Sequence, residues 1–229
     1  MYEIKENIKK IFEHISEIAL KNNRNPNEIT IVAVSKTFPK EFIIEAYNAG
    51  LTEIGESYIQ EAENKTNELK NYKIKWHLVG HLQSNKAKKA VQLFDTIQSI
   101  DKLSTLEKVD KISNQLNKIQ EVFIEVNTSF ETSKFGINPD ELIQFLNVAK
   151  NFKNIKINGL MTIGPLTDDK KLIKNSFLKL KELFYKANEE LKLEMKYLSM
   201  GMSDDYDIAI ECGSNMLRIG RKIFGERRF

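Results

Sequence analysis

Short apolar segments typical of buried strands alternate with amphipathic helical segments along almost the whole chain. Eight strands are predicted, at Ile31–Val34, Glu53–Gly55, Ile74–Leu78, Thr96–Gln98, Glu121–Val126, Ile155–Leu160, Tyr197–Ser199 and Met216–Ile219. Helices are predicted between them, at Pro39–Ala49, Tyr58–Leu69, Ser84–Leu93, Lys102–Leu116, Asp140–Lys150, Leu172–Leu191 and Asp204–Cys212. Strict alternation favours a parallel sheet covered by helices. Eight repeats in 229 residues fit a single (β/α)₈ TIM barrel better than an open doubly wound sheet.

The chain shows no linker-like composition, so residues 1–229 are expected to form one domain. An extra helix is predicted before the first strand, over residues 1–21, where apolar residues recur every three or four positions. This segment lacks the apolar centre of a signal peptide, and no segment approaches membrane-spanning length. The longest irregular loop, residues 127–139, is expected to belong to a site.

The composition limits the kinds of partner that this protein is expected to bind. Lys and Arg total 35 and Asp and Glu 32, so the net charge is only +3. That balance gives no sign of a nucleic-acid or membrane surface. A single cysteine, Cys212, allows no disulfide within the chain and indicates a reducing compartment, so we expect a cytoplasmic protein. No histidines or carboxylates have metal-ligand spacing, so no metal is predicted.

Lys36 is the most informative residue, because it directly follows a buried strand although lysine is rarely buried. In such barrels, functional groups gather where strands end. A partly desolvated amine near other cations, here Lys134, Arg218 and Arg221, can lose its proton, attack an aldehyde and form a Schiff base. The alternative is a surface lysine whose stem covers apolar atoms while its amine stays in water.

Two turns have the chemistry of a phosphate site. In SMGMSDD, Gly201 allows close backbone approach, and Ser203 is a candidate N-cap for a helix starting at Asp204. In RIGRKIFG, Gly220 precedes a final short helix. Helix starts after the seventh and eighth strands can bind phosphate, although simple capping would give the same pattern. Together with Lys36, they suggest a ligand with both a phosphate and an aldehyde, such as pyridoxal 5′-phosphate (PLP).

Seven ordered motifs spread over the whole chain carry a family resemblance: AVSKT (33–37), IGESYIQE (54–61), WHLVGHLQSNK (76–86), TSKFGI (132–137), GLMTIG (159–164), YLSMGMSDD (197–205) and RIGRKIFGER (218–227). The chain closely resembles the pyridoxal phosphate homeostasis protein family. The resemblance implies a barrel similar to the N-terminal domain of alanine racemase, with PLP held as a Schiff base on Lys36. It also implies a protein that carries or buffers PLP, affects amino-acid and keto-acid balance and has no established turnover.

The resemblance implies roles for further residues. Those implied to hold the phosphate are Gly201, Met202, Ser203, Gly220 and Arg221. Arg218 resembles the arginine that faces the pyridine nitrogen in the racemase barrel. Such a guanidinium would leave that nitrogen unprotonated and weaken the ring as an electron sink, which suits a carrier. Lys134 is expected as a secondary lysine near the phenolic oxygen or an incoming carboxylate, and it could accept PLP in transfer.

Three positions depart from the family pattern: Ile54, where the family's FGEN motif has Phe, together with Ser57 and Arg221. Ser57 stands where the family usually has Asn, so a direct contact from that loop is in doubt. Arg221 replaces a small or hydroxyl residue, and it could add charge to the phosphate or point to solvent. His77 is a further candidate. It could titrate against the cofactor or be held by a backbone carbonyl.

Three functions therefore compete. The first is a PLP carrier, expected as a monomer, whose recipients would be PLP-dependent apo-enzymes. The second is a low-activity racemase, which needs an opposing acid/base usually supplied by a second domain that we do not expect here. Tyr58 or Tyr206 would have to replace that group. The third is a PLP-free Schiff-base aldolase, which would not need Arg218 across the site and should lack a visible absorption band.

Overall fold

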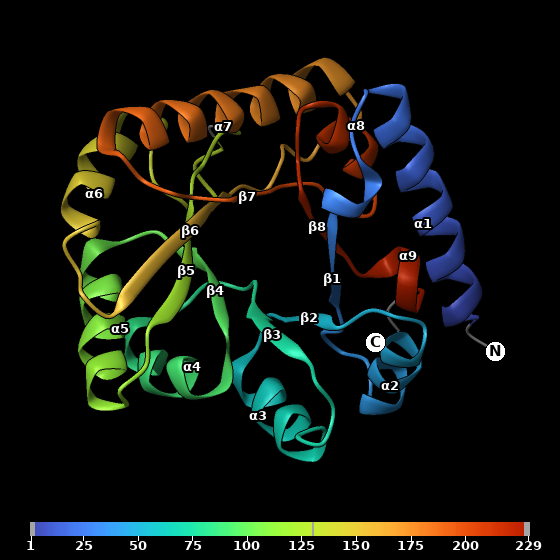
Figure 1. Ribbon diagram of the computed structural model, residues 1–229, viewed down its shortest axis with the longest axis horizontal. Coiled ribbons are helices and arrows are strands. Elements are labelled where there is room, and N and C mark those ends of the chain that lie inside the picture. The colour runs from blue at the N-terminus through green and yellow to red at the C-terminus, as the bar shows by residue number, and fades with distance from the viewer. Residues whose placement is uncertain (1–2, 130, 227–229) are drawn as a thin grey trace.

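The eight predicted strands close into one parallel barrel in the computed structural model, which describes residues 3–129 and 131–226. The strands follow chain order around the ring, and the last pairs with the first, with Val32 opposite Arg218 (Figure 1). Their bounds are β1 Thr30–Val34, β2 Glu53–Glu56, β3 Lys75–Leu78, β4 Thr96–Ile100, β5 Gln120–Glu125, β6 Ile155–Met161, β7 Tyr197–Ser199 and β8 Met216–Ile219. The predicted (β/α)₈ barrel is confirmed.

Helices surround the barrel in the order that the alternation requires (Figure 1). They are α1 Ile4–Lys21, α2 Lys40–Asn48, α3 Ile59–Glu68, α4 Ala87–Leu93, α5 Leu103–Gln115, α6 Leu142–Ala149, α7 Lys170–Leu191, α8 Tyr206–Glu211 and α9 Arg221–Phe224, with short 3₁₀ turns at Pro26–Glu28, Ser84–Lys86 and Pro139–Glu141. Most ends lie within a few residues of the prediction, and the first two residues of the predicted N-terminal helix lie outside the described part. The helix expected from Asp204 begins only at Tyr206.

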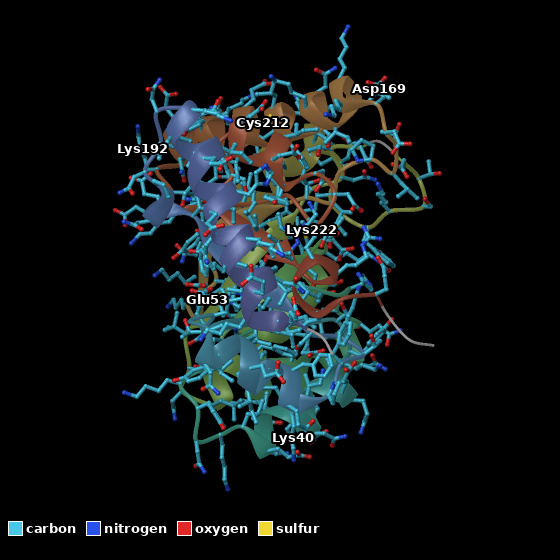
Figure 2. All side chains as sticks on the ribbon, turned by 90° about the vertical axis from the view of Figure 1, so that its right-hand side faces the viewer. Lys40, Glu53, Asp169, Lys192, Cys212 and Lys222 are labelled. Carbon is cyan, nitrogen blue, oxygen red and sulfur yellow. The ribbon has the colours of Figure 1, made fainter. Side chains whose placement is uncertain are left out.

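The additional helix α1 covers the outside of the barrel beside α2, α8 and α9 (Figure 2). One stripe of it is buried, formed by Ile4, Ile8, Ile11, Ile15, Ile18 and Ala19. The spacing of three and four residues places these side chains on one face. Phe12, which lies beside this stripe in the sequence, is 41% exposed. The hydrophobic stripe therefore accounts for the predicted extra helix.

The barrel interior has an apolar cluster of its own, formed by Val32, Phe123, Met161 and Met216. These residues come from four strands, and alternate strand residues point inward. The larger hydrophobic core lies between the strands and the surrounding helices. Among the residues that the structure describes, no helix has the length and apolar character needed to cross a membrane.

Candidate functional site

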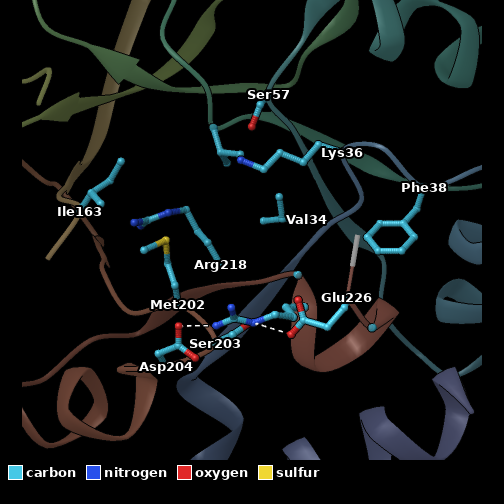
Figure 3. Close-up of a pocket in the computed structure, with 14 residues that line it drawn as sticks. Val34, Lys36, Phe38, Ser57, Ile163, Met202, Ser203, Asp204, Arg218 and Glu226 are labelled. Carbon is cyan, nitrogen blue, oxygen red and sulfur yellow. Dashed lines mark hydrogen bonds and ion pairs between the residues drawn. The ribbon is translucent and has the colours of Figure 1, made fainter. Parts of the chain in front are cut away.

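A cavity of about 420 Å³ lies at the end of the barrel where the strands stop (Figure 3). Seven of the ten predicted site residues line it: Lys36, Ser57, Met202, Ser203, Arg218, Gly220 and Arg221. The rest of its wall is formed by Val34, Phe38, Val79, Ile163, Asp204, Gly225 and Glu226. Residues from both halves of the chain thus meet in one pocket, as the strand-end argument predicts.

Lys36 lies two residues after β1, and its side chain extends into the cavity between Ser57 and Arg218 (Figure 3). This observation favours the site lysine over the solvated surface lysine. Val34 and Phe38 stand on either side of it in the sequence and also line the cavity. The amine therefore lies beside both apolar and cationic groups.

A buried ionic cluster holds the backbone on both sides of Lys36. Lys65 Nζ donates hydrogen bonds to the Ser35 carbonyl at 2.8 Å and to Oε1 of Glu56 and Glu61 at 2.7 Å each. The Thr37 N–H donates to Glu61 Oε1 at 2.7 Å. Thr37 adopts a φ of +70°, which is unfavourable for a β-branched residue and requires such support.

The turn before α8 differs from the predicted N-cap. The Ser203 hydroxyl accepts a hydrogen bond from the Lys222 N–H at 3.3 Å, in the first turn of α9. Asp205 Oδ1 instead accepts from the Met202 N–H at 2.6 Å. Ser203 therefore does not cap α8 as expected. It joins the loop after β7 to the helix after β8, so the two proposed halves of the phosphate site are connected directly.

Two glycines in this region allow close packing. Gly201 has a φ of +97°, and a Cβ there would lie 2.6 Å from the Ala209 Cβ. A Cβ on Gly220 would lie 3.0 Å from the Val34 carbonyl oxygen. Gly220 lines the cavity, whereas Gly201 does not. Gly201 thus shapes the cradle through its backbone conformation.

Arg221 lies at the rim of the cavity and is bonded to carboxylates. It forms an ion pair with Asp204 and a second one with Glu226 at 3.4 Å (Figure 3). The hydrogen bond with Asp204 raises the pKa of Arg221. Arg221 therefore lines the cavity while two carboxylates hold its guanidinium.

Arg218 is a buried cation in the cavity wall. Its Nη1 donates to Ser199 Oγ and its Nη2 to the Thr162 carbonyl, both at 2.7 Å. Burial lowers the pKa of Arg218 to about 10, although Asp205 and Glu125 oppose this. The guanidinium therefore stays protonated at neutral pH, and two hydrogen bonds fix its plane.

His77 and Lys134 do not line the cavity. His77 is buried inside the barrel, with Nε2 2.7 Å from Glu53 Oε2 and Nδ1 2.9 Å from Gln98 Nε2. Side chains hold its ring, rather than the backbone carbonyl that was one of its two predicted alternatives, and any effect on a ligand is indirect. Lys134 donates to the Gly164 carbonyl at 2.6 Å and to Glu131 at 2.8 Å. It stands beside the cavity, next to the segment that contributes Ile163.

Sequence reasoning assigned no role to several polar residues near the site. Glu56, Glu61 and Lys65 form the cluster behind Lys36, and only the i,i+4 spacing of Glu61 and Lys65 gave a signal. Glu125 was also missed. Burial raises its pKa to about 7, Asp101 adds to this rise and Arg218 opposes it. In residues 3–129 and 131–226, no group of three or more His, Cys, Asp or Glu side chains could hold a metal ion.

The fold and site together define a (β/α)₈ barrel protein with a cavity at the strand ends, beside a lysine after β1. The family model described as alanine racemase, N-terminal domain, matches residues 4–228. Curated relatives from Aquifex aeolicus and Haemophilus influenzae, both pyridoxal phosphate homeostasis proteins, are 35% and 37% identical. They align over 98% and 99% of this chain and over 98% and 97% of their own lengths. The chain belongs to the pyridoxal phosphate homeostasis protein family, which confirms the resemblance predicted from its motifs.

Solved structures agree with this assignment. PipY of Synechococcus elongatus PCC7942, in a structure with PLP bound, is 32% identical with a TM-score of 0.86, covering 97% of this chain and 100% of that one. Alanine racemase of Clostridium difficile 630 is 14% identical with a TM-score of 0.78, covering 96% of this chain but 57% of its own. The second likeness shows the shared barrel fold alone.

Proposed function

We propose that this chain binds PLP in the strand-end cavity and acts as a carrier or buffer of the cofactor. The observation that carries this proposal is that one cavity joins Lys36, the buried Arg218 and the turn containing Ser203. A volume of about 420 Å³ lies within the ordinary range for small-molecule sites. An amine, a fixed cation and a hydroxyl beside a helix start are the groups that an aldehyde, a ring nitrogen and a phosphate would need.

The phosphate would lie against Met202, Ser203 and Gly220, because the loop after β7 and the start of α9 meet there. The hydroxyl of Ser203 can donate to an anion while it accepts from the Lys222 N–H. Arg221 would attract the phosphate from the rim, with part of its charge offset by Asp204 and Glu226. These contacts would fix the end of the ligand that does not react.

The amine of Lys36 would bond to the aldehyde carbon, with loss of one water molecule. Arg218 would face the ring nitrogen and could only donate to it, which leaves that nitrogen without a proton. PLP with an unprotonated ring nitrogen is a weaker electron sink. The buried arginine therefore supports storage and delivery rather than turnover.

Titration with PLP tests this proposal. We expect the purified protein to become yellow, and borohydride reduction followed by peptide mass mapping should place a pyridoxyl group on Lys36. Lys36→Ala should lose the band while its unfolding free energy stays close to that of the parent. Lys134→Ala is the matched control and should keep the band. An adduct found mainly on Lys134 would show that the wrong lysine was chosen.

A second experiment separates a carrier from a racemase. The PLP-loaded protein is incubated with individual amino acids in heavy water, and exchange of the α-proton is followed by NMR. We expect no exchange beyond that caused by free PLP, because the electron sink is weak. Exchange at an enzymic rate would establish turnover. A PLP-free aldolase would instead form a borohydride adduct with a carbonyl substrate and show no visible band.

The same proposal extends to the oligomeric state, the location and the recipients of PLP. We infer a monomer that works in the cytoplasm as a single PLP-binding domain, residues 1–229, and passes PLP to apo-enzymes. Lys134, held 2.6 Å from the Gly164 carbonyl beside the cavity, is the proposed secondary lysine on that route. Size-exclusion chromatography coupled to light scattering, with and without PLP, tests the monomer.

A further inference from the structure

An unbroken series of hydrogen bonds crosses the inside of the barrel. Arg218 Nη1 donates to Ser199 Oγ at 2.7 Å, and Ser199 Oγ donates to Gln98 Oε1 at 2.6 Å. Gln98 Nε2 lies 2.9 Å from His77 Nδ1, and His77 Nε2 lies 2.7 Å from Glu53 Oε2. We call these five residues the interior chain. It begins in the cavity wall and ends at the first residue of β2.

Every bond of the interior chain runs in one direction. Arginine can only donate and an ionised carboxylate can only accept, so the two ends of the interior chain have fixed roles, and the placed Gln98 amide, whose Oε1 accepts from Ser199, sets the direction between them. The Gln98 amide then donates to His77 Nδ1, and His77 donates from Nε2 to Glu53. Turning the amide over would require a proton on Nδ1, and Nε2 would then face the carboxylate without a hydrogen unless the ring were charged. With the Gln98 amide oriented as the structure places it, the interior chain therefore has the His77 proton on Nε2.

The interior chain is unusual for its position, because the inside of such a barrel is normally filled by branched apolar side chains. His77, Gln98 and Ser199 are fully buried beside the apolar interior cluster. Burial of polar groups is costly unless every group is bonded, whereas a fully bonded network fixes one arrangement. The three groups are bonded from end to end, which a random polar substitution in the core would not achieve.

The two ends carry opposite charges. Arg218 is the buried cation of the cavity wall. Burial alone would raise the pKa of Glu53, but the hydrogen bond from His77, the charge of His77 when that ring is protonated and the attraction of Lys75 lower it below its ordinary value. Glu53 is thus an anion at neutral pH, at the opposite end of the barrel from the cavity.

We propose that the interior chain positions Arg218, so that Glu53, outside the cavity, sets the orientation of the donors that Arg218 presents to a ligand. The Thr162 carbonyl holds Nη2, and the interior chain holds Nη1, which together fix the guanidinium plane. Glu53, His77, Gln98 and Ser199 are therefore positioning residues. The identity of the ligand rests on the proposed function, whereas the interior chain is a property of the protein itself.

Glu121 is a matched control for Glu53. It also lies at the start of its strand and is similarly exposed, 18% against 22% for the side chains. It accepts hydrogen bonds from Thr96 at 2.7 Å and from Asn158 at 2.6 Å, and none of these bonds leads to Arg218. Ser214 is the matched control for Ser199, because it is a buried serine whose hydroxyl is bonded to backbone carbonyls.

The first experiment measures the PLP dissociation constant by absorbance for Glu53→Gln, Glu121→Gln, Ser199→Ala and Ser214→Ala. We expect Ser199→Ala to weaken binding about tenfold, as loss of one hydrogen bond of about 1.4 kcal/mol would do. Glu53→Gln should weaken binding roughly threefold, a smaller effect, because the glutamine oxygen can still accept a hydrogen bond from His77. The two controls should match the parent. Equal constants for Glu53→Gln and Glu121→Gln would overturn the proposal.

The double variant Glu53→Gln/Ser199→Ala separates positioning from a general loss of stability. If Glu53 acts through Ser199, its effect on the dissociation constant disappears once Ser199 is removed, while its effect on unfolding in urea persists. Additive effects on binding would overturn the proposal.

The third measurement needs no ligand. Nitrogen-15 NMR of the PLP-free protein should show the His77 proton on Nε2 and an Nδ1 that accepts from Gln98, and Glu53→Gln should weaken that preference. A proton on Nδ1 would overturn the proposal directly. Failure of the parent protein to bind PLP would instead contradict the proposed function, and this measurement would still decide the direction of the interior chain.

Discussion

The ammonium nitrogen of Lys65 lies 2.7 Å from Glu56 Oε1, and both side chains are buried between α3 and β2. The same ammonium donates to the Ser35 carbonyl at 2.8 Å, and the Ser35 hydroxyl donates to Glu56 Oε1 at 2.5 Å. Because Ser35 immediately precedes Lys36, the ion pair fixes the backbone from which the site lysine extends.

Lys65→Met should therefore destabilise the protein, because it leaves a buried carboxylate without its cation. Removal of one partner of a buried pair costs about 3 to 5 kcal/mol. Burial raises the pKa of Glu56, so protonation can relieve part of the loss, and we expect about 3 kcal/mol in urea unfolding. Lys89→Met is the control, because the Lys89–Glu63 pair is exposed and should cost less than about 1 kcal/mol. Equal losses would show that the buried pair has no special importance.

Gly201→Ala should be more harmful than Gly50→Ala, although the two glycines have nearly the same φ, +97° and +98°. Each substitution introduces left-handed strain of about 1 kcal/mol. At Gly50 a Cβ meets nothing within 4 Å, whereas at Gly201 it would lie 2.6 Å from Ala209 Cβ and force α8 to move. We expect a total of about 3 kcal/mol at Gly201 in urea unfolding, with weaker PLP binding. Similar losses at both sites would exclude the steric contribution.

The sequence allowed the barrel to be predicted because strand and helix periods alternate locally, and each element needs only its own pattern. The start of α8 at Tyr206 was not predictable in the same way. Asp205 Oδ1 accepts from the Met202 N–H, so the side chain stabilises a turn at the position where the Ser203 pattern indicated a helix N-cap. Competition between turn and cap depends on geometry that composition does not encode.

The candidate site was predictable to the extent that strand ends converge. Lys36 and Arg218 were identified from their positions after and within apolar strands, and the structure places both in one cavity. The interior chain was not predictable, because Gln98 and Ser199 are 101 positions apart and meet only when the barrel closes. A single sequence shows a histidine, an amide and a hydroxyl in separate strands, without showing which of them face each other.

Glu125→Gln should change how stability depends on pH. Burial and nearby Asp101 raise the pKa of Glu125 from 4.5 to about 7, with Arg218 opposing. The folded protein thus holds this proton more tightly than the unfolded chain, and the resulting stability is complete below about pH 4.5 and lost as the pH rises through 7. The loss amounts to about 3 kcal/mol, because a tenfold change in proton affinity corresponds to about 1.4 kcal/mol. The glutamine variant stays neutral, so it should gain on the parent by up to that amount between pH 4.5 and 8, measured by urea unfolding at each pH.

Glu121→Gln should change the pH dependence of stability in the opposite direction to Glu125→Gln. Burial would raise the pKa of Glu121, but hydrogen bonds from Thr96 and Asn158 and the attraction of Lys75 lower it below 4.5. Its stabilising contribution is present above pH 4.5 and is lost as the pH falls through the lower folded value. The unfolding free energy of this variant should fall below that of the parent as the pH rises. If unfolding free energy depended on pH in the same way for Glu121→Gln and Glu125→Gln, the assignment of Glu125 as a group buried in its neutral form would be contradicted.

Asp204→Asn should strengthen PLP binding, because it removes a negative charge from the cavity wall and releases Arg221 from its shorter ion pair. Exposed pairs contribute up to about 1 kcal/mol, so an affinity gain of roughly threefold is expected. Titrations at about 0.05 M and 1 M salt check the cause, since screening at 1 M acts within about 3 Å and should remove most of the gain. Asp207→Asn makes the same charge change in α8, outside the cavity wall, and should gain less than half as much. Equal gains would assign the effect to net charge, and a loss of affinity for Asp204→Asn would mean that Asp204 holds Arg221 in its phosphate-binding position.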